Sequence, residues 1–400
     1  MTTEPKARGR LAEYLDESQP EVQHLLKHGW AVVRVFSEED AAKYCRWVWN
    51  DLASIGTGIK PKDESTLVDG KWPGAPRGLM QSGGAGLWPS HCAAANAAEP
   101  AMKRLFGGKR ADEPLLRSWD ALAIMPPGKV KNYPKKCFDK DVPALSCWLH
   151  TDDAPPKYKG TDLVHWIQGC IALEPVEHGD IGTQIVGAPD GMNAQAFVDW
   201  FGTERPDQAP SEAKLKAAAQ WKRVGWCDHQ KGDKEWLCKN GVVVKPNLRP
   251  GEMLLWCSRM PHANVAEDAD KDKPRNWRTS ILTNYIPRAV CYEKEVAKRQ
   301  EMGEKKRTSG HQVVARGVHF DKNGSLCEQL FSITPNIYGP PRPGDFDPKT
   351  HKLPTMSGFA RYKRPREEWG EHEQLPDPER HPKLFKIHAD TARLCFGYDA

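Results

Sequence analysis

Gly251-Glu252-Met253-Leu254-Leu255-Trp256 begins at a turn residue and continues into a short apolar run. A run of about four to eight apolar residues, bounded by Gly, Pro or Asp, is typical of a buried strand. With this run included, short strand-like runs recur between Leu115 and Pro287, with Gly, Pro and Asp between them, at 116–125, 145–149, 164–173, 182–187, 241–245, 252–256 and 277–286. Many short strands in succession predict a mainly β fold with helical additions, either a sandwich or a barrel.

The β pattern is interrupted once, by a polar segment at about 191–237. Part of this segment, Ser211 to Trp221, has a helix-forming composition. We expect it to be an insert that lies outside the β core. The sequence therefore predicts one core region, 115–290, that carries the insert.

The region before the core, 1–114, begins with a polar end over 1–20 that we expect to be frayed. Gly29 to Phe36 is rich in β-branched and aromatic residues and predicts a buried strand. Residues 56–98 are rich in Gly and Pro, which predicts a long irregular region of the kind that often shapes a site.

A helix is predicted directly after that first strand. Ser37 has the pattern of an N-cap, and the acidic residues that follow it favour a first helical turn. The helix should continue to about Ile55. Its apolar face is expected to consist of Ala42, Cys45, Val48 and Leu52.

The region after the core, 291–400, combines a charged helical stretch with a proline-rich tail. The helical stretch is Glu293 to Lys306, and the prolines concentrate in 338–382. Because the tail lacks periodic apolar runs, we expect it to wrap over the core and to form no domain of its own.

The charge balance limits the kinds of partner. Lys and Arg number 58 against 53 acidic residues, which leaves a net charge of +5 on 400 residues. A chain that binds nucleic acid through its surface is usually more strongly basic. A small-molecule partner is therefore expected more than a nucleic acid.

The cysteines and the first residues bear on the compartment. Eleven cysteines are scattered singly with no C-x-x-C pair, and Met1 to Pro5 lacks the apolar core of a signal peptide. No apolar run approaches the roughly 18 residues of a membrane span. These features favour the reducing cytoplasm and give no reason to expect a membrane partner.

The most informative motif is Trp148-Leu149-His150-Thr151-Asp152. His150 and Asp152 are two residues apart, and on a strand such residues share a face. An imidazole and a carboxylate could therefore meet one metal ion. Further along the chain, the strand at 251–256 leads into a turn that presents His262. Two histidines and one carboxylate form the facial triad that leaves open positions on a non-haem Fe(II) ion.

A second motif follows on the next expected strand, where Arg278 and Ser280 share one face. A buried guanidinium beside a hydroxyl is suited to holding a carboxylate. Arg275 is the other candidate for this role, but it lies in the loop after Pro274, so strand parity favours Arg278.

Each motif alone also has an ordinary structural explanation. His150 beside Asp152 could be a surface pair, His262 could be a turn residue, and Arg278 could belong to a surface ion pair. The order of the motifs is more specific than any one of them. An H-x-D motif, then a strand that leads to a histidine, and then R-x-S rarely follow one another in this order by chance.

This order resembles that of the Fe(II)/2-oxoglutarate-dependent dioxygenases, and within them the phytanoyl-CoA dioxygenase-like branch. The resemblance covers about 115–290 together with the Gly29–Phe36 strand and its helix, and Gln168-Gly169 matches the strand that follows H-x-D in that family. Two departures are visible. The stretch Gly187 to Gly191 lacks the Ser-His that the branch often has, and Glu267 to Lys273 lengthens the loop before Arg278.

The resemblance implies a double-stranded β-helix of the jelly-roll or cupin type. It implies that His150, Asp152 and His262 bind Fe(II), and that Arg278 and Ser280 hold the distal carboxylate of 2-oxoglutarate. O₂ would be the second cosubstrate, with ascorbate as a candidate reductant. Trp148 and Gln168 are candidates for the wall of the cosubstrate pocket, although Trp148 has an equally good explanation as a core residue.

The expected activity is oxidation of an unactivated C–H bond, with release of succinate and CO₂. The resemblance does not choose among hydroxylation, desaturation, cyclisation and demethylation. A small metabolite, such as an amino acid or an intermediate of secondary metabolism, is the expected substrate. The alternatives are a modified-base oxygenase that acts on DNA or RNA, and a non-catalytic β-barrel that binds a ligand. The oligomeric state and the identity of the substrate stay open at this point.

Overall fold

The computed structural model gives the placement of most of the β core and of the helices around it. The described residues are 11–54, 59–66, 79–80, 82–108, 112–127, 141–146, 148–152, 164, 166–204, 227–266, 276–291, 293–304, 383 and 386–396. The proline-rich tail 338–382, the stretch Ser211 to Trp221 and Arg275 lie outside them, so the expectations for those segments stay predictions.

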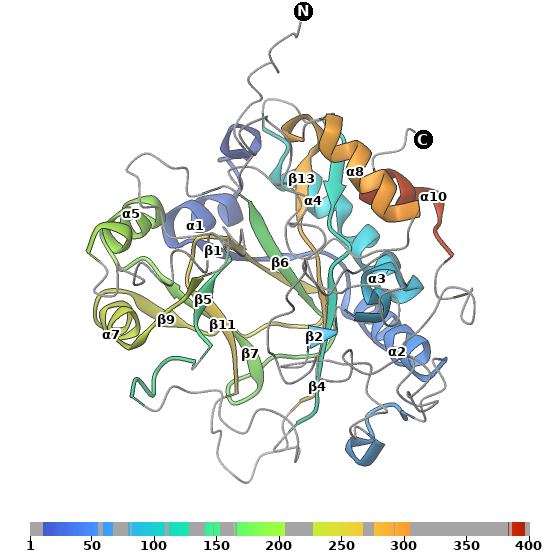
Figure 1. Ribbon diagram of the computed structural model, residues 1–400, viewed down its shortest axis with the longest axis horizontal. Coiled ribbons are helices and arrows are strands. Elements are labelled where there is room, and N and C mark those ends of the chain that lie inside the picture. The colour runs from blue at the N-terminus through green and yellow to red at the C-terminus, as the bar shows by residue number, and fades with distance from the viewer. Residues whose placement is uncertain are drawn as a thin grey trace, which may run out of the picture.

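Antiparallel sheets with helices around them form the structure (Figure 1). The largest sheet has six strands in the order β1-β10-β6-β12-β4-β2. Its strands are β1 (Trp30–Arg34), β2 (Leu79–Met80), β4 (Ala121–Met125), β6 (Ile167–Ala172), β10 (Glu252–Cys257) and β12 (Arg278–Leu282). The three central strands, β10, β6 and β12, are almost wholly buried. Of these, β10 is a continuous apolar run after Glu252, whereas β6 and β12 also bury polar residues such as Gln168 and Arg278.

A second sheet has five strands in the order β8-β5-β11-β7-β9. Its strands are β5 (His150–Thr151), β7 (Ile181–Gly187), β8 (Cys227–Asp228), β9 (Val242–Val244) and β11 (His262–Ala266). A two-stranded sheet joins β3 (Leu115–Arg117) to β13 (Tyr285–Pro287). The prediction of a mainly β fold with helical additions is confirmed.

Two of the expected strands, 116–125 and 277–286, are each divided in the structure. In both segments the backbone passes between the six-stranded sheet and the two-stranded sheet, and it bends at the same level. Where they bend, the Ser118 N–H donates to the Asn284 carbonyl at 2.8 Å, and the Asn284 N–H donates to Ser118 Oγ at 2.8 Å. The side chain of Ser118 thus replaces one ladder bond at the bend, which the apolar pattern could not indicate.

The helices surround the sheets on both sides. They are α1 (Pro20–His28), α2 (Glu38–Ser54), α3 (Pro89–Ala97), α4 (Glu99–Leu105), α5 (Ala194–Glu204), α7 (Lys231–Asn240), α8 (Glu293–Glu304) and α10 (Ala389–Thr391), with short 3-10 or π turns such as Leu11–Tyr14 and Ala392–Phe396. Figure 1 shows α2 and α3 beside β4 and β2, and α5 and α7 at the other side, near β9. The helices α5 and α7 lie within the expected insert 191–237 or extend just past its end.

Helix α2 follows its sequence prediction closely. The Asp40 N–H donates to Ser37 Oγ at 3.0 Å, so Ser37 caps the first turn as expected. The buried face differs in one position, because Ala41, Cys45, Val48, Trp49 and Leu52 are buried while Ala42 is exposed. Trp49 packs edge to face on Trp277, with ring centroids 5.2 Å apart, which places α2 against one end of β12.

Helix α3 corrects the expectation of an irregular region over 56–98. It runs from Pro89, whose missing N–H is tolerated at the first helical position, through an alanine-rich stretch. His91 Nε2 lies 3.1 Å from the Leu282 carbonyl, so α3 packs on β12. Composition alone placed this stretch with the Gly- and Pro-rich residues before it, although its alanines favour a helix.

The expected strand at 145–149 is also wrong. The Leu145 N–H donates to the Val142 carbonyl at 2.9 Å, and the Leu149 N–H donates to the Ser146 carbonyl at 3.2 Å. These local bonds form turns, so the strand β5 begins only at His150. The chain therefore enters the five-stranded sheet at the first residue of the H-x-D motif.

Among the described residues, no helix is both long enough and apolar enough to cross a membrane.

Candidate metal centre

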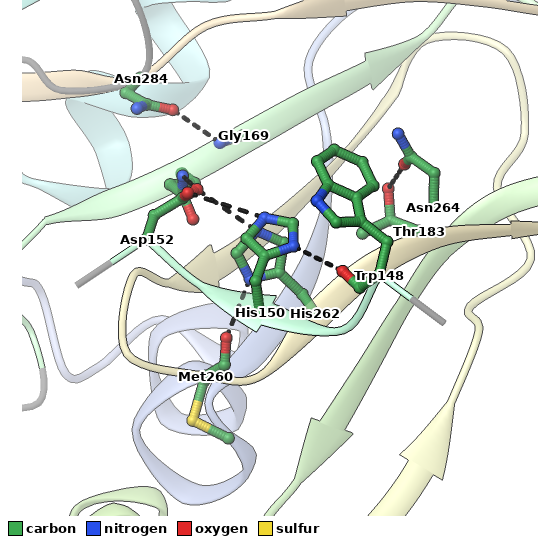
Figure 2. A network of polar contacts seen from close by, with 10 residues as sticks. Trp148, His150, Asp152, Gly169, Thr183, Met260, His262, Asn264 and Asn284 are labelled. Atoms are coloured by element: carbon green, nitrogen blue, oxygen red, sulfur yellow. Dashed lines mark hydrogen bonds and ion pairs between the residues drawn. The ribbon is translucent and has the colours of Figure 1, made fainter. Parts of the chain in front are cut away.

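His150, Asp152 and His262 come together in the structure. His150 begins β5 and His262 begins β11, and the two residues are direct cross-strand partners. His150 Nε2 lies 3.7 Å from Asp152 Oδ1, and His262 Nε2 lies 3.3 Å from Asp152 Oδ2. One ligand atom from each residue lies within 4.8 Å of the other two, which is close enough for one metal ion. Figure 2 shows both imidazoles directed toward Asp152.

Backbone carbonyls fix the orientation of both imidazole rings. His150 Nδ1 lies 2.8 Å from the Trp148 carbonyl, and His262 Nδ1 lies 2.9 Å from the Met260 carbonyl (Figure 2). Because a carbonyl can only accept, each Nδ1 carries a proton, so in the neutral imidazole each Nε2 presents a lone pair. This is the tautomer that a metal ion requires, and such carbonyl bonds commonly orient metal-binding histidines.

The turn that contains Met260 packs against a glycine of the N-terminal region. Gly29 ends α1 with φ of 84°, a conformation that glycine adopts without strain. A Cβ at Gly29 would lie only 2.4 Å from the Met260 sulfur, so a larger residue there would force the end of the Met260 side chain to move. The Cys257 N–H also donates to the Gly29 carbonyl at 3.0 Å. The turn that presents His262 is therefore held against the end of α1.

Asp152 is fixed by a neighbour on the other sheet. Gln168, on β6, donates its Nε2–H to Asp152 Oδ2. Asp152 and the two histidines are 4–7% exposed, so a carboxylate and two imidazoles share a nearly dry site. A buried carboxylate is costly unless a cation meets it. Two neutral Nε2 atoms and one carboxylate suit a divalent first-row metal ion, and this donor set is that of the facial triad.

Two tryptophans lie beside the histidines. The Trp148 ring lies over His150 with centroids 4.6 Å apart, and the Trp256 ring lies 5.1 Å from His262. Their rings place apolar surface against the two imidazoles. A low-dielectric surrounding strengthens interactions between charges at such a site.

The three residues open into a pocket between the two large sheets, which holds about 370 Å³ of space when its open mouth is included. Its lining includes every site residue that the sequence favoured except Ser280, while the alternative anchor Arg275 lies outside the described residues. The lining residues are Leu79, Trp148, His150, Asp152, Gln168, Cys170, Thr183, Trp256, His262, Ala263, Asn264, Arg278 and Leu282.

Arg278 is 4% exposed, and its guanidinium reaches across from the six-stranded sheet to the five-stranded sheet. Nη1 donates to Asn264 Oδ1 at 2.6 Å, and Nη2 donates to Thr183 Oγ1 at 3.0 Å and lies 3.5 Å from Cys170 Sγ. No carboxylate among the described residues forms an ion pair with it. A buried guanidinium with only neutral partners can accept an anion from outside the chain.

Ser280 follows Arg278 on the same face of β12 by the strand period, and it is buried. It is not part of the pocket lining, although Leu282, the next residue on that face, is. The neighbours that do reach Arg278 are Thr183 and Asn264, which the sequence did not nominate. Asn264 could have been found by parity, because it lies two residues after His262 on one strand. Thr183 required the pairing of β7 with β11.

No protein-family model and no curated protein sequence matches this chain. Solved structures resemble it at low identity. A putative oxidoreductase from Salmonella typhimurium LT2 aligns with a TM-score of 0.45 and 16% identity, over 72% of this chain and 75% of that one. The non-heme alpha ketoglutarate dependent carbocyclase SnoK from nogalamycin biosynthesis aligns with a TM-score of 0.37 and 14% identity, over 70% and 87%. AviO1 from Streptomyces viridochromogenes Tue57 aligns with a TM-score of 0.36 and 16% identity, over 69% of this chain and 96% of that one. Because these TM-scores are below 0.5, the functional argument depends on the geometry of the site.

Proposed function

We propose that this chain is a non-haem Fe(II)- and 2-oxoglutarate-dependent oxygenase of the phytanoyl-CoA dioxygenase-like branch. The observation that carries the proposal is one pocket that contains both a possible metal triad and a buried arginine with neutral partners. The first is suited to a metal with open coordination positions, and the second to a carboxylate at a distance from it. 2-Oxoglutarate has both a chelating end and a distal carboxylate, so it matches the two ends of the pocket.

His150, Asp152 and His262 would hold the Fe(II). When bound, the iron and 2-oxoglutarate supply the activation of O₂ and the oxidation of a C–H bond, with succinate and CO₂ as products. The chain itself orients the two imidazoles through Trp148 and Met260 and places apolar tryptophan rings against them.

Arg278 would hold the distal carboxylate of 2-oxoglutarate. Its Nη1 and Nη2 are already oriented by Asn264 and Thr183, so little side-chain entropy is lost when an anion arrives. Ser280 is proposed as a second donor because it shares the face of Arg278 on β12. Its side chain does not line the pocket, so a rotation toward the bound carboxylate would be required. Trp148 is proposed as part of the pocket wall.

The fold proposed with this function is a double-stranded β-helix. Strands β4, β6, β10 and β12 belong to the six-stranded sheet, while β5, β7, β9 and β11 belong to the five-stranded sheet. Apart from the step from β7 to β9, successive strands of this series alternate between the two sheets, as expected when an antiparallel pair is wound into a jelly roll. The metal ligands lie at the ends of β5 and β11, between the two layers.

We propose a small metabolite as the substrate. The pocket is narrow, and among the described residues that line it the basic one other than the two histidines is Arg278, which is assigned to the cosubstrate. A polyanionic strand would need a basic surface around the mouth, and the net charge of +5 on 400 residues provides little excess for one.

The test is succinate formation from 2-oxoglutarate by the purified full chain with Fe(II), ascorbate and O₂, across a panel of metabolites that includes oligonucleotides. We expect succinate above the background, increased further by the true substrate. The Asp152→Ala variant should form none. Absence of succinate from the wild-type chain under every condition, with Fe(II) demonstrably bound, would contradict the proposal.

A further inference from the structure

Two side chains of the pocket have buried polar atoms with no hydrogen-bond partner among the described residues. They are Gln168, through Oε1, and Trp256, through Nε1. Both residues line the pocket, and they are 2% and 5% exposed. A buried donor or acceptor without a partner costs free energy and is rare in folded proteins. Two of them in one pocket indicate that a bound group completes the site.

The two residues are neighbours. Gln168 on β6 and Trp256 on β10 are direct cross-strand partners in the six-stranded sheet. Side chains at such positions on one face have Cβ atoms about 4.5–5.5 Å apart. One small group can therefore reach both of them.

The orientation of the Gln168 amide is set by the candidate metal ligand. Nε2 must face Asp152 Oδ2, because a carboxylate oxygen accepts and the amide oxygen would repel it. Oε1 is then the free acceptor of the amide. Trp256 contributes only a donor, and its ring lies 5.1 Å from that of His262. The unmet acceptor and the unmet donor thus lie beside two of the three candidate metal ligands.

The opposite end of the pocket has a different character. Cys170, two residues after Gln168 on the same strand, lies 3.5 Å from Arg278 Nη2. Along β6 the pocket therefore changes from an uncharged acceptor and donor at the triad to a cationic group at Arg278. The two ends would select different groups.

We infer that Gln168 and Trp256 together recognise one uncharged group of the substrate that both donates and accepts a hydrogen bond, namely a hydroxyl or a carboxamide next to the reacting carbon. This inference rests on the proposed function. A carboxylate would leave Gln168 Oε1 without a donor, and an ammonium would leave Trp256 Nε1 without an acceptor. Either charged group would also cost more to bury than a neutral one.

The test uses the full chain and two probes of matched size, propionamide and propionate, with binding measured by ligand-observed NMR titration. Propionamide should bind the wild type, and Trp256→Phe, which keeps a ring but removes the indole N–H, should weaken it about tenfold. Gln168→Leu should weaken it to a similar extent. Trp277→Phe, a tryptophan outside the pocket lining that packs on Trp49, is the matched control and should have no effect.

Propionate separates this inference from the proposed function. It should bind at Arg278, be lost in Arg278→Met and be unchanged in Trp256→Phe. If propionate fails to bind while propionamide depends on Gln168 and Trp256, the polar pair is supported and the arginine assignment fails. If propionamide does not bind the wild type, or binds both variants as well as the wild type, the inference is overturned whatever propionate does.

Discussion

His262 is the direct cross-strand partner of His150, and the centroids of their rings lie 4.5 Å apart. The register of β11 against β5 therefore brings the two histidines together, although they are far apart in the sequence. A slip of one residue would turn His262 to the opposite face of the sheet. The long pairing of β11 with β7, from His262 to Ala266, fixes which face of the sheet His262 occupies, whereas β5 itself has only two residues.

Arg278→Ala tests the assignment of the carboxylate anchor. Loss of a buried, charge-assisted contact should cost about 2–5 kcal/mol, so the KM for 2-oxoglutarate should rise roughly thirtyfold to several thousandfold. Steady-state kinetics with 2-oxoglutarate as the varied substrate measure this. Arg275→Ala is the matched control and should leave the constant unchanged, and the reverse result would mean that Arg275 is the anchor.

Asn264→Ala tests whether the neighbours of Arg278 orient it. The Nη1 bond to Asn264 Oδ1 is 2.6 Å long and holds one side of the guanidinium. Its loss should raise the KM for 2-oxoglutarate by about tenfold, less than the loss of Arg278 itself, with a smaller effect on kcat. Asn240→Ala, whose side chain bonds to the Trp236 carbonyl within α7, is the control. Equal KM values in both variants would argue against an orienting role.

His91 should make the protein sensitive to acid. Burial lowers the pKa of His91 from its ordinary value of 6.5 to about 3, so the folded chain keeps this imidazole neutral while the unfolded chain binds a proton below about pH 6.5. Stability should therefore fall as the pH is lowered from about 6.5, by ~2 kcal/mol at about pH 5 from this group alone. Urea unfolding of wild type and His91→Asn at several pH values measures it. The variant should show a shallower slope below about pH 6.5, and identical slopes would contradict the assignment.

Ser37→Ala should destabilise helix α2 without affecting the site. The side chain accepts from the Asp40 N–H at 3.0 Å, and loss of such a cap costs about 1 kcal/mol. The Tm should fall by a few degrees, measured by circular dichroism. Ser54→Ala at the other end of α2, where Oγ donates to the Asp51 carbonyl, is the control and should change the Tm less. Equal changes in Tm would contradict the capping role.

Much of the β core could be predicted from the sequence because its central strands are buried on both faces. Strand β10 is an apolar run that follows Gly251, and β6 and β7 combine apolar residues with a few polar ones between Gly, Pro or Asp. The structure places all three within a few residues of the expected bounds. His150 and Asp152, two residues apart, were expected to share a face, and their side chains do point toward one another in the structure. The strand, however, begins at His150 and not before it.

The features of the site that the sequence did not predict depend on contacts between segments that are distant in the chain. Thr183 and Asn264 lie side by side because β7 pairs with β11 in the five-stranded sheet, and Arg278 reaches them across the pocket from the other sheet, which no local pattern reveals. The bond from Gln168 to Asp152 joins the two sheets in the same way. Helix α3 was missed because glycines and prolines dominate the composition of the stretch around it. Local sequence therefore nominated the three residues of the candidate metal centre, which the structure brings together, but not the residues that surround Arg278.

The central claim is that His150, Asp152 and His262 hold one metal ion, and an anaerobic Fe(II) titration of the full chain tests it most directly. We expect one equivalent of Fe(II) per chain, with binding abolished or weakened by orders of magnitude in Asp152→Asn and His262→Ala, while Arg278→Ala binds as the wild type does. Circular dichroism should show that all variants are folded. Failure of the wild type to bind Fe(II), or unchanged binding in the folded Asp152→Asn variant, would contradict the account.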